Sequence, residues 1–224
     1  MSSASRTSFY AEPNKATRAM IGAILARAGS TDFTDPVEVA GLRGAMRAAF
    51  ELITARAERE DRVLGPLLRR HAPASALEIT CAHSEHRSRM RRLIARIADA
   101  EWRRDGTPHA LVVALARFAA DLGALLADQE EIAMPALEAA LSPEDLAEAA
   151  LRLDQAAPLE ERLAWLRWTL PAISHPERVA RLRALRAEPE IYPDAVAIAR
   201  AVLDHDARAR VEIALSLQPP ARAA

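Results

Sequence analysis

A carboxylate, two imidazoles and two carboxamides lie on helix faces that the sequence pattern predicts to be buried. Glu60 continues the apolar spacing of one predicted helix, and His83 and His86 continue that of the next. Asn14 and Gln129 hold similar positions in two further predicted helices. Because steps of three and four residues place side chains on one face of a helix, these polar groups should point into the interior. Imidazole and carboxylate groups that converge from facing helices suit a buried metal centre.

The apolar stripes that carry these residues have helical periodicity, and the first stripe is the least apolar because it includes Thr17. In chain order, the stripes comprise Tyr10, Asn14, Thr17, Ile21 and Ile24; Phe50, Ile53, Ala57, Glu60, Leu64 and Leu67; Ile79, His83, His86, Met90, Leu93 and Ile97; and Leu115, Phe118, Leu122, Leu125, Gln129 and Ile132. The polar residues lie near the start of the first and third helices and near the end of the second and fourth. In helices that alternate in direction those ends meet, so we expect the polar side chains to form one layer.

The elements that must position this layer are all predicted to be helical. Alanine, leucine, arginine and glutamate dominate, and the 7 glycines and 14 prolines cluster at breaks. Joined by short turns, the long helices are expected at about 13–28, 36–70, 76–103 and 108–141. Short connections favour antiparallel neighbours, so residues 9–141 are predicted to form an all-α, up-down four-helix bundle. A C-terminal helical extension with shorter helices and proline-containing turns is predicted over residues 142–218.

Composition and charge exclude several classes of protein. The chain of 224 residues carries 30 basic and 31 acidic residues, for a net charge of -1, and aromatic residues make up 4%. Interspersed charges and few aromatic residues argue against a nucleic-acid partner. The longest uncharged apolar runs, such as HALVVALA (109–116), are too short to span a membrane, and Cys81 is the single cysteine. We therefore expect a cytoplasmic protein without a nucleic-acid or membrane partner.

The order of these helices resembles the hemerythrin-like (HHE cation-binding) domain family over the whole predicted bundle. Glu60 followed six residues later by Pro66, and the run DQEEIAMPAL (128–137), are similar to the second and fourth helices of that family. AEPNKATRAMIGAIL (11–25) is similar to the first helix, and AHSEHRSRMRRL (82–93) is similar to the third. The resemblance implies a non-haem di-iron centre bound through histidines and carboxylates, in a protein that binds oxygen or acts as a sensor.

The ligand positions that the family implies mostly hold other residues here. Asn14 stands where the first helix should offer a histidine. The HxxxE motif of the second helix reads Arg56-x-x-x-Glu60, and imidazole remains only in the third helix. In the fourth helix the same motif reads Leu125-x-x-x-Gln129, so the resemblance implies that Leu125 and Gln129 both line the former metal layer. Because two divalent irons need several anionic or imidazole donors, the resemblance implies a di-iron site that has been dismantled.

Arg56 offers a positive charge where the family would have iron, because residues four apart are neighbours on a helix. A buried carboxylate such as that of Glu60 needs a charged or hydrogen-bonded partner. We therefore predict a metal-free, hydrogen-bonded layer made of Asn14, Arg56, Glu60, Gln129 and either His83 or His86. The expected function is a non-enzymatic binding or interaction module without a cofactor, whose partner is a protein or a small molecule.

Two alternative hypotheses keep a metal. In the first, Glu60, His83 and His86, with or without Glu130, bind a single iron or zinc ion in a sensor or an oxygen-binding protein. In the second, two histidines and one carboxylate hold a mononuclear iron for an oxidoreductase. A small ligand or haem could also occupy the space in the bundle where the family holds its di-iron centre. Periodicity does not decide between His83 and His86, since both fall in the same stripe.

Overall fold

The computed structural model describes residues 9–98 and 108–216, and the regular secondary structure in these ranges is entirely helical. The predicted all-α class is therefore confirmed. In chain order the elements are α1 (Ala11–Ser30), α2 (Pro36–Val63), α3 (Gly65–His71), α4 (Pro73–Ala98), α5 (Pro108–Asp128), the π-helix η2 (Gln129–Ala133), α6 (Met134–Ala140), α7 (Pro143–Gln155), α8 (Leu159–Ala172), α9 (His175–Leu185), α10 (Tyr192–Val202) and α11 (His205–Ser216). The predicted end of the third long helix, at about residue 103, lies outside the described residues.

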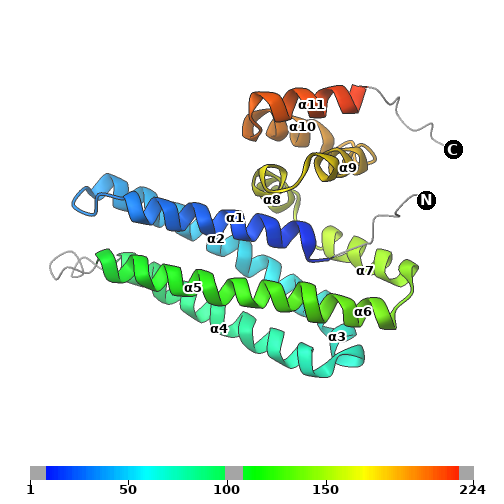
Figure 1. Cartoon of the computed structure of the whole chain (residues 1–224), viewed down its shortest axis with the longest axis horizontal. Helices are drawn as coiled ribbons and strands as arrows, with labels where there is room; N and C mark the ends of the chain where they lie inside the picture. Colours follow the sequence, from blue (N-terminus) through cyan, green and yellow to red (C-terminus); the bar gives the residue numbers. More distant parts are fainter. Residues whose placement is uncertain (1–8, 99–107, 217–224) are drawn as a thin grey trace. The chain divides into compact units, whose positions relative to one another are not determined.

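The long helices α1, α2, α4 and α5 lie side by side (Figure 1). Contacts join α1 to α2, α2 to α4, α4 to α5 and α5 back to α1, so these helices enclose one core. The predicted stripes are buried along most of their length. Fully buried side chains of this core include Met20, Leu42, Met46, Leu111 and Phe118.

The predicted stripe of the last long helix is wrong at its end. Ile132 is expected in the interior, but it is 51% exposed, whereas Ala133 and Met134 are buried. The cause is the π turn η2, in which the N–H of Met134 bonds to the carbonyl of Gln129, five residues earlier. A π turn inserts one extra residue, so the interior face moves on by one position. Pro135 follows directly and has no N–H to donate, which disfavours a regular α-helical turn here.

The helix predicted over residues 36–70 is divided into α2 and α3 at Leu64. Pro66 lies just after the break, and proline cannot donate the main-chain hydrogen bond that a continuous helix requires. The N–H of Leu64 still bonds to the carbonyl of Glu60 at 2.8 Å. Glu60 therefore occupies the last full turn of α2, and α3 continues beyond it against α4 and α6.

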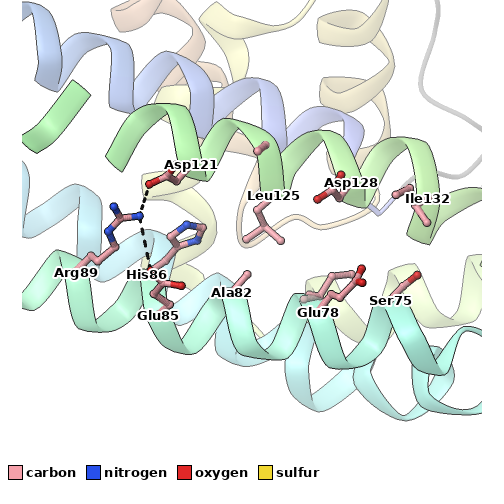
Figure 2. Close-up of a pocket in the computed structure, with 12 residues that line it drawn as sticks. Ser75, Glu78, Ala82, Glu85, His86, Arg89, Asp121, Leu125, Asp128 and Ile132 are labelled. Atoms are coloured by element: carbon pink, nitrogen blue, oxygen red, sulfur yellow. Dashed lines mark hydrogen bonds and ion pairs between the residues drawn. The ribbon is translucent and has the colours of Figure 1, made fainter. Parts of the chain in front are cut away.

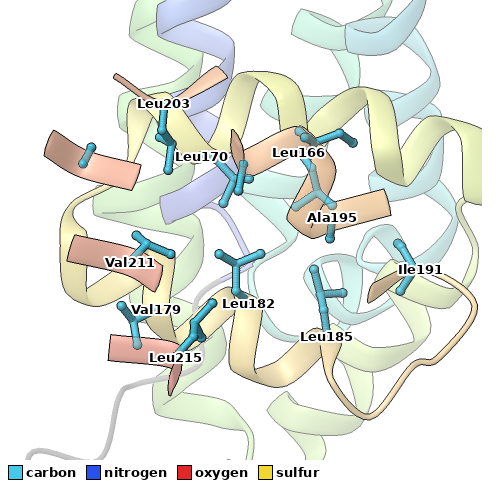
Figure 3. Close-up of a cluster of buried hydrophobic side chains, with 13 residues drawn as sticks. Leu166, Leu170, Val179, Leu182, Leu185, Ile191, Ala195, Leu203, Val211 and Leu215 are labelled. Carbon is cyan, nitrogen blue, oxygen red and sulfur yellow. The ribbon is translucent and has the colours of Figure 1, made fainter. Parts of the chain in front are cut away.

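Contacts divide the chain into two compact units, Met1–Ala156 and Ala157–Ala224. The division lies one helix later than the boundary predicted at residue 142, because α7 contacts α2 and α6 of the first unit. The second unit has its own hydrophobic core, to which α8, α9, α10 and α11 all contribute (Figure 3). Leu170, Leu182, Ile191 and Ala195 are fully buried at its centre.

The stretch Pro108–Ala140 is long and apolar enough to cross a membrane by length and composition, with a mean hydropathy of 1.9 in its most apolar window. The uncharged runs did not indicate this, because Arg117 and Asp121 interrupt the apolar stretch. The same stretch contributes Leu111, Leu115, Phe118 and Leu122 to the core of the first unit. A core helix of a soluble protein can be equally long and apolar. The absence of a membrane partner therefore remains a prediction.

Candidate functional site

Arg56 and Glu60 lie one turn apart near the end of α2, and their side chains form an ion pair in the interior. Arg56 Nε donates to Glu60 Oε1 at 2.5 Å, while Arg56 Nη2 donates to the carbonyl of Phe9 at 2.7 Å. The side chain of Glu60 is 7% exposed and that of Arg56 is 17% exposed. A buried carboxylate is tolerated when a charged group donates to it in good geometry. The contact predicted between these two side chains is present.

Gln129 reaches the same carboxylate from η2. Its Nε2 donates to Glu60 Oε2 at 3.0 Å and lies 3.4 Å from His83 Nε2. His83 Nε2 is also 3.8 Å from Glu60 Oε2. Side chains from α2, α4 and η2 therefore meet at one carboxylate. We call Arg56, Glu60, His83 and Gln129 the Glu60 layer.

A second carboxylate, Asp61, holds the other side of the His83 ring. His83 Nδ1 lies 2.7 Å from Asp61 Oδ1, and Arg87 Nη1 donates to Asp61 Oδ2 at 3.3 Å. When Nδ1–H donates to Asp61, His83 Nε2 is an acceptor that suits the amide of Gln129. Burial alone would raise the pKa of Asp61, but the hydrogen bond with His83, together with the nearby Arg87 guanidinium, holds it below its usual 3.8. Asp61 therefore sets the orientation of His83 within the layer.

The sequence pattern does not single out Tyr10 or Asp61 as site residues. Tyr10 precedes α1 and is 1% exposed. Burial raises the pKa of the Tyr10 phenol strongly, the negative charge of Glu60 adds to the rise, and the positive charge of Arg56 opposes it. The hydroxyl therefore stays protonated beside the ion pair. The position of Tyr10 at the head of the first apolar stripe is the signal that could have identified it.

Asn14 and Leu125, which are predicted to line the layer, contact other groups. Asn14 is 3% exposed, and its Nδ2 donates to the carbonyl of Leu126 at 3.1 Å. This bond ties α1 to α5 near the start of η2. Leu125 is 7% exposed and lines a groove beside α4 and α5. The hydrogen-bonded layer is therefore smaller than predicted.

His86 is buried without joining the Glu60 layer. Its ring packs edge-on against Phe118, with ring centroids 5.7 Å apart, and it lines the same groove as Leu125 (Figure 2). His86 Nδ1 is buried and has no hydrogen-bond partner among the described residues. Burial lowers the pKa of His86 below its usual 6.5, and the positive charge of Arg89 adds to the effect. Of the two histidines, His83 is the one that faces Glu60.

The three candidates for residual metal ligands, Glu60, His83 and His86, do not converge on one point. His83 Nε2 and Glu60 Oε2 are 3.8 Å apart, and His86 lines the groove instead. Both carboxylate oxygens of Glu60 already accept hydrogen bonds, one of them from a guanidinium. In the described part of the chain, no group of three or more His, Cys, Asp or Glu side chains is placed to hold a metal ion. Arg18 Nη1 donates to Glu130 Oε1 at 2.9 Å, so Glu130 is already paired with a cation. The residues present therefore do not fit a di-iron centre.

Comparison with known proteins gives no match. No protein-family model, no curated protein and no solved structure matches this chain significantly. The hemerythrin-like interpretation therefore depends on the order of the helices and on the residues of the Glu60 layer.

Acid should destabilise the first unit in two separate steps. His86 stays neutral in the fold, whereas the unfolded chain takes up a proton near its usual pKa of 6.5, so stability should fall as the pH drops below about 6.5. The pKa of Asp61 is lowered in the fold, so its contribution should be lost only as the pH falls below its usual 3.8. Urea unfolding followed by circular dichroism between about pH 3 and about pH 8 measures both steps.

Two variants separate these steps. His86→Gln should remove the loss of stability that begins near pH 6.5 and leave the one at lower pH. Asp61→Asn should diminish the low-pH step, to which the lowered pKa of Asp32 also contributes, and leave the first. A wild-type free energy of unfolding that stays level from about pH 7 to about pH 5 would contradict a neutral, buried His86.

Proposed function

We propose that residues 9–141 form an up-down four-helix bundle of hemerythrin-like type, in which the Glu60 layer takes the place of a di-iron centre. The closed ring of contacts among α1, α2, α4 and α5 supports the bundle, as do their alternating directions (Figure 1). The layer joins the end of α2, the first half of α4 and the π turn after α5. Those are ends that meet when consecutive helices are antiparallel.

The observation that carries this proposal is the hydrogen bond from Arg56 to Glu60. A guanidinium has donors only and a fixed positive charge, so it neutralises the carboxylate without offering a ligand to a metal. Gln129 occupies the second carboxylate oxygen with a further donor. A metal ion entering the layer would have to displace both donors while lying next to the Arg56 cation. The arrangement therefore favours an interior without metal.

We infer that the protein is a non-enzymatic binding or interaction module. The Arg56–Glu60 pair has no redox chemistry, and Glu60 and His83 are only 6% and 4% exposed, so a substrate has no direct access to them. A buried polar network of this kind favours one packing of the helices over others. A protein or small molecule is the proposed partner, without nucleic acid or membrane. The cytoplasm is the proposed location, with which the free, exposed Cys81 agrees.

Metal analysis of the freshly purified full-length protein tests this proposal. After expression in medium supplemented with iron and zinc, we expect less than about 0.1 iron or zinc per chain by inductively coupled plasma mass spectrometry. Stoichiometric iron would refute the proposal. An optical spectrum that then changes with oxygen would favour an oxygen carrier, and turnover of added peroxide would favour an oxidoreductase. A single bound metal without either response would favour a sensor.

A further inference from the structure

A groove beside α4 and α5 is a second candidate site, separate from the Glu60 layer. It has a volume of about 390 Å³, which lies in the range of sites for small organic molecules. Glu78 and Asp128 face each other across the groove toward one end, where Ser75 and Ile132 also lie (Figure 2). Arg89, Glu85 and Asp121 lie at the other end. Charged side chains therefore lie toward both ends of the groove.

The two ends of the groove differ in how their charges are compensated. Arg89 forms an ion pair with Asp121 and lies 3.9 Å from Glu85. Glu78 and Asp128 have no ion-pair partner among the described residues. Two carboxylates that face each other without a cation leave a local excess of negative charge. That end of the groove favours a positively charged ligand.

The wall between the two ends is apolar, apart from one imidazole. Ala82 and Leu125 line this middle part (Figure 2). His86 lies between it and Arg89 (Figure 2), is only 7% exposed, and has a buried Nδ1 without a hydrogen-bond partner among the described residues. Leaving a buried polar group unpaired costs free energy. A ligand that forms a hydrogen bond with this imidazole would therefore be favoured.

We propose that this groove binds a small organic monoamine with an apolar body and a terminal hydroxyl. The ammonium group bonds to Glu78 and Asp128, the body lies against Ala82 and Leu125, and the hydroxyl bonds to His86. This inference goes beyond the proposed function and does not depend on the metal content of the Glu60 layer. The proposed ligand is an organic cation rather than a metal ion, because no group of three or more His, Cys, Asp or Glu side chains in the described residues is placed to hold a metal.

The length of the groove limits the size of the ligand. Glu78 and His86 are eight residues apart on α4, which corresponds to about 12 Å along a helix. Two hydrogen bonds of about 3 Å each leave roughly 6 Å between the polar ends of the ligand. A hydroxyphenyl ring with a short aminoalkyl arm, as in tyramine, is of this size. A second ammonium group would meet the guanidinium of Arg89, so a diamine should bind less well.

Isothermal titration calorimetry of the full chain with tyramine tests the proposal. We expect saturable binding with a Kd between about 0.1 and about 1 mM, which is usual for so small a ligand. N-acetyltyramine, which lacks the charge, should bind at least about 10-fold more weakly. Phenethylamine, which lacks the hydroxyl, and the diamine 1,6-diaminohexane should each bind about 3-fold to 10-fold more weakly. Failure of tyramine to bind would overturn the proposal.

A pair of double variants gives the matched comparison. Glu78→Gln/Asp128→Asn should weaken tyramine binding at least about 10-fold. Glu51→Gln/Glu58→Gln removes the same charge from exposed positions of α2 and should leave binding unchanged. Equal losses in both variants would overturn the site, as would displacement of tyramine by equimolar Mg²⁺ or Zn²⁺. Circular dichroism of each variant checks that it is folded. Metal analysis of the same samples tests the proposed metal-free Glu60 layer independently, so failure of one proposal can be told from failure of the other.

Discussion

Replacing Arg56 with methionine should lower the free energy of unfolding by about 3 to 5 kcal/mol, because it leaves the Glu60 carboxylate buried without its charged donor. Methionine keeps an unbranched apolar stem of similar shape, so the guanidinium, with its charge and hydrogen bonds, is what is lost. The two side chains are only 17% and 7% exposed, which limits solvent screening of the pair. Urea unfolding at neutral pH, followed by circular dichroism, measures the change.

A double variant and a surface pair serve as controls for this prediction. Arg56→Met/Glu60→Gln removes both charges and keeps an acceptor for the Gln129 amide, so it should recover most of the lost stability. Arg152 and Glu148 form an ion pair with the same four-residue spacing on the surface of α7, with side chains 68% and 58% exposed. Arg152→Met should change stability by less than about 1 kcal/mol. Similar losses in Arg56→Met and Arg152→Met would contradict a buried, energetically coupled pair.

Periodicity alone was sufficient to place the main members of the layer in the interior. Glu60, His83 and Gln129 continue apolar stripes, and all are buried. This works because a period of 3.6 residues reports which face of a helix is covered, whatever residue stands there. The contact between Arg56 and Glu60 was also predictable, since a spacing of four residues makes them neighbours on one helix.

The roles of the two histidines could not be read from the pattern. His83 and His86 are three residues apart, which separates them by only about 60° around the helix axis. Both are buried, so burial does not distinguish them. Their surroundings do, because Phe118 packs against His86 while Asp61 bonds to His83. Those contacts come from other helices and depend on packing that a single stripe does not contain.

The π turn is the other feature that a fixed period misses. Extending the stripe from Gln129 at helical spacing places Ile132 in the core, whereas η2 adds one residue and turns Ile132 outward. Pro135 was the available signal, because proline disfavours a regular α-helical turn just before it. The same turn begins at Gln129, whose amide bonds to Glu60. The local irregularity and the polar layer therefore occur at the same place in the chain.

Introducing a histidine and a glutamate at two positions of the layer should turn it into a metal site. In Arg56→His/Gln129→Glu, a carboxylate replaces the amide whose Nε2 lies 3.0 Å from Glu60 Oε2 and 3.4 Å from His83 Nε2, and an imidazole replaces the guanidinium. Two imidazoles and two carboxylates can then surround one ion, which is a suitable donor set for zinc or iron. Without metal, the two carboxylates repel each other, so the variant should be less stable than the wild type.

Thermal unfolding with and without zinc measures this conversion. At a free zinc concentration about 100-fold above the Kd, binding should add about 2.7 kcal/mol to the stability of the double variant, and a chelator should remove it. The wild type should show no comparable rise in Tm, because Arg56 and Gln129 already fill both oxygens of Glu60 with donors. Adding Glu60→Gln to the double variant removes the central ligand and should abolish the response. An equal zinc-dependent rise in the wild type would mean that the guanidinium does not exclude a metal from this layer, and the proposed metal-free interior would then be wrong.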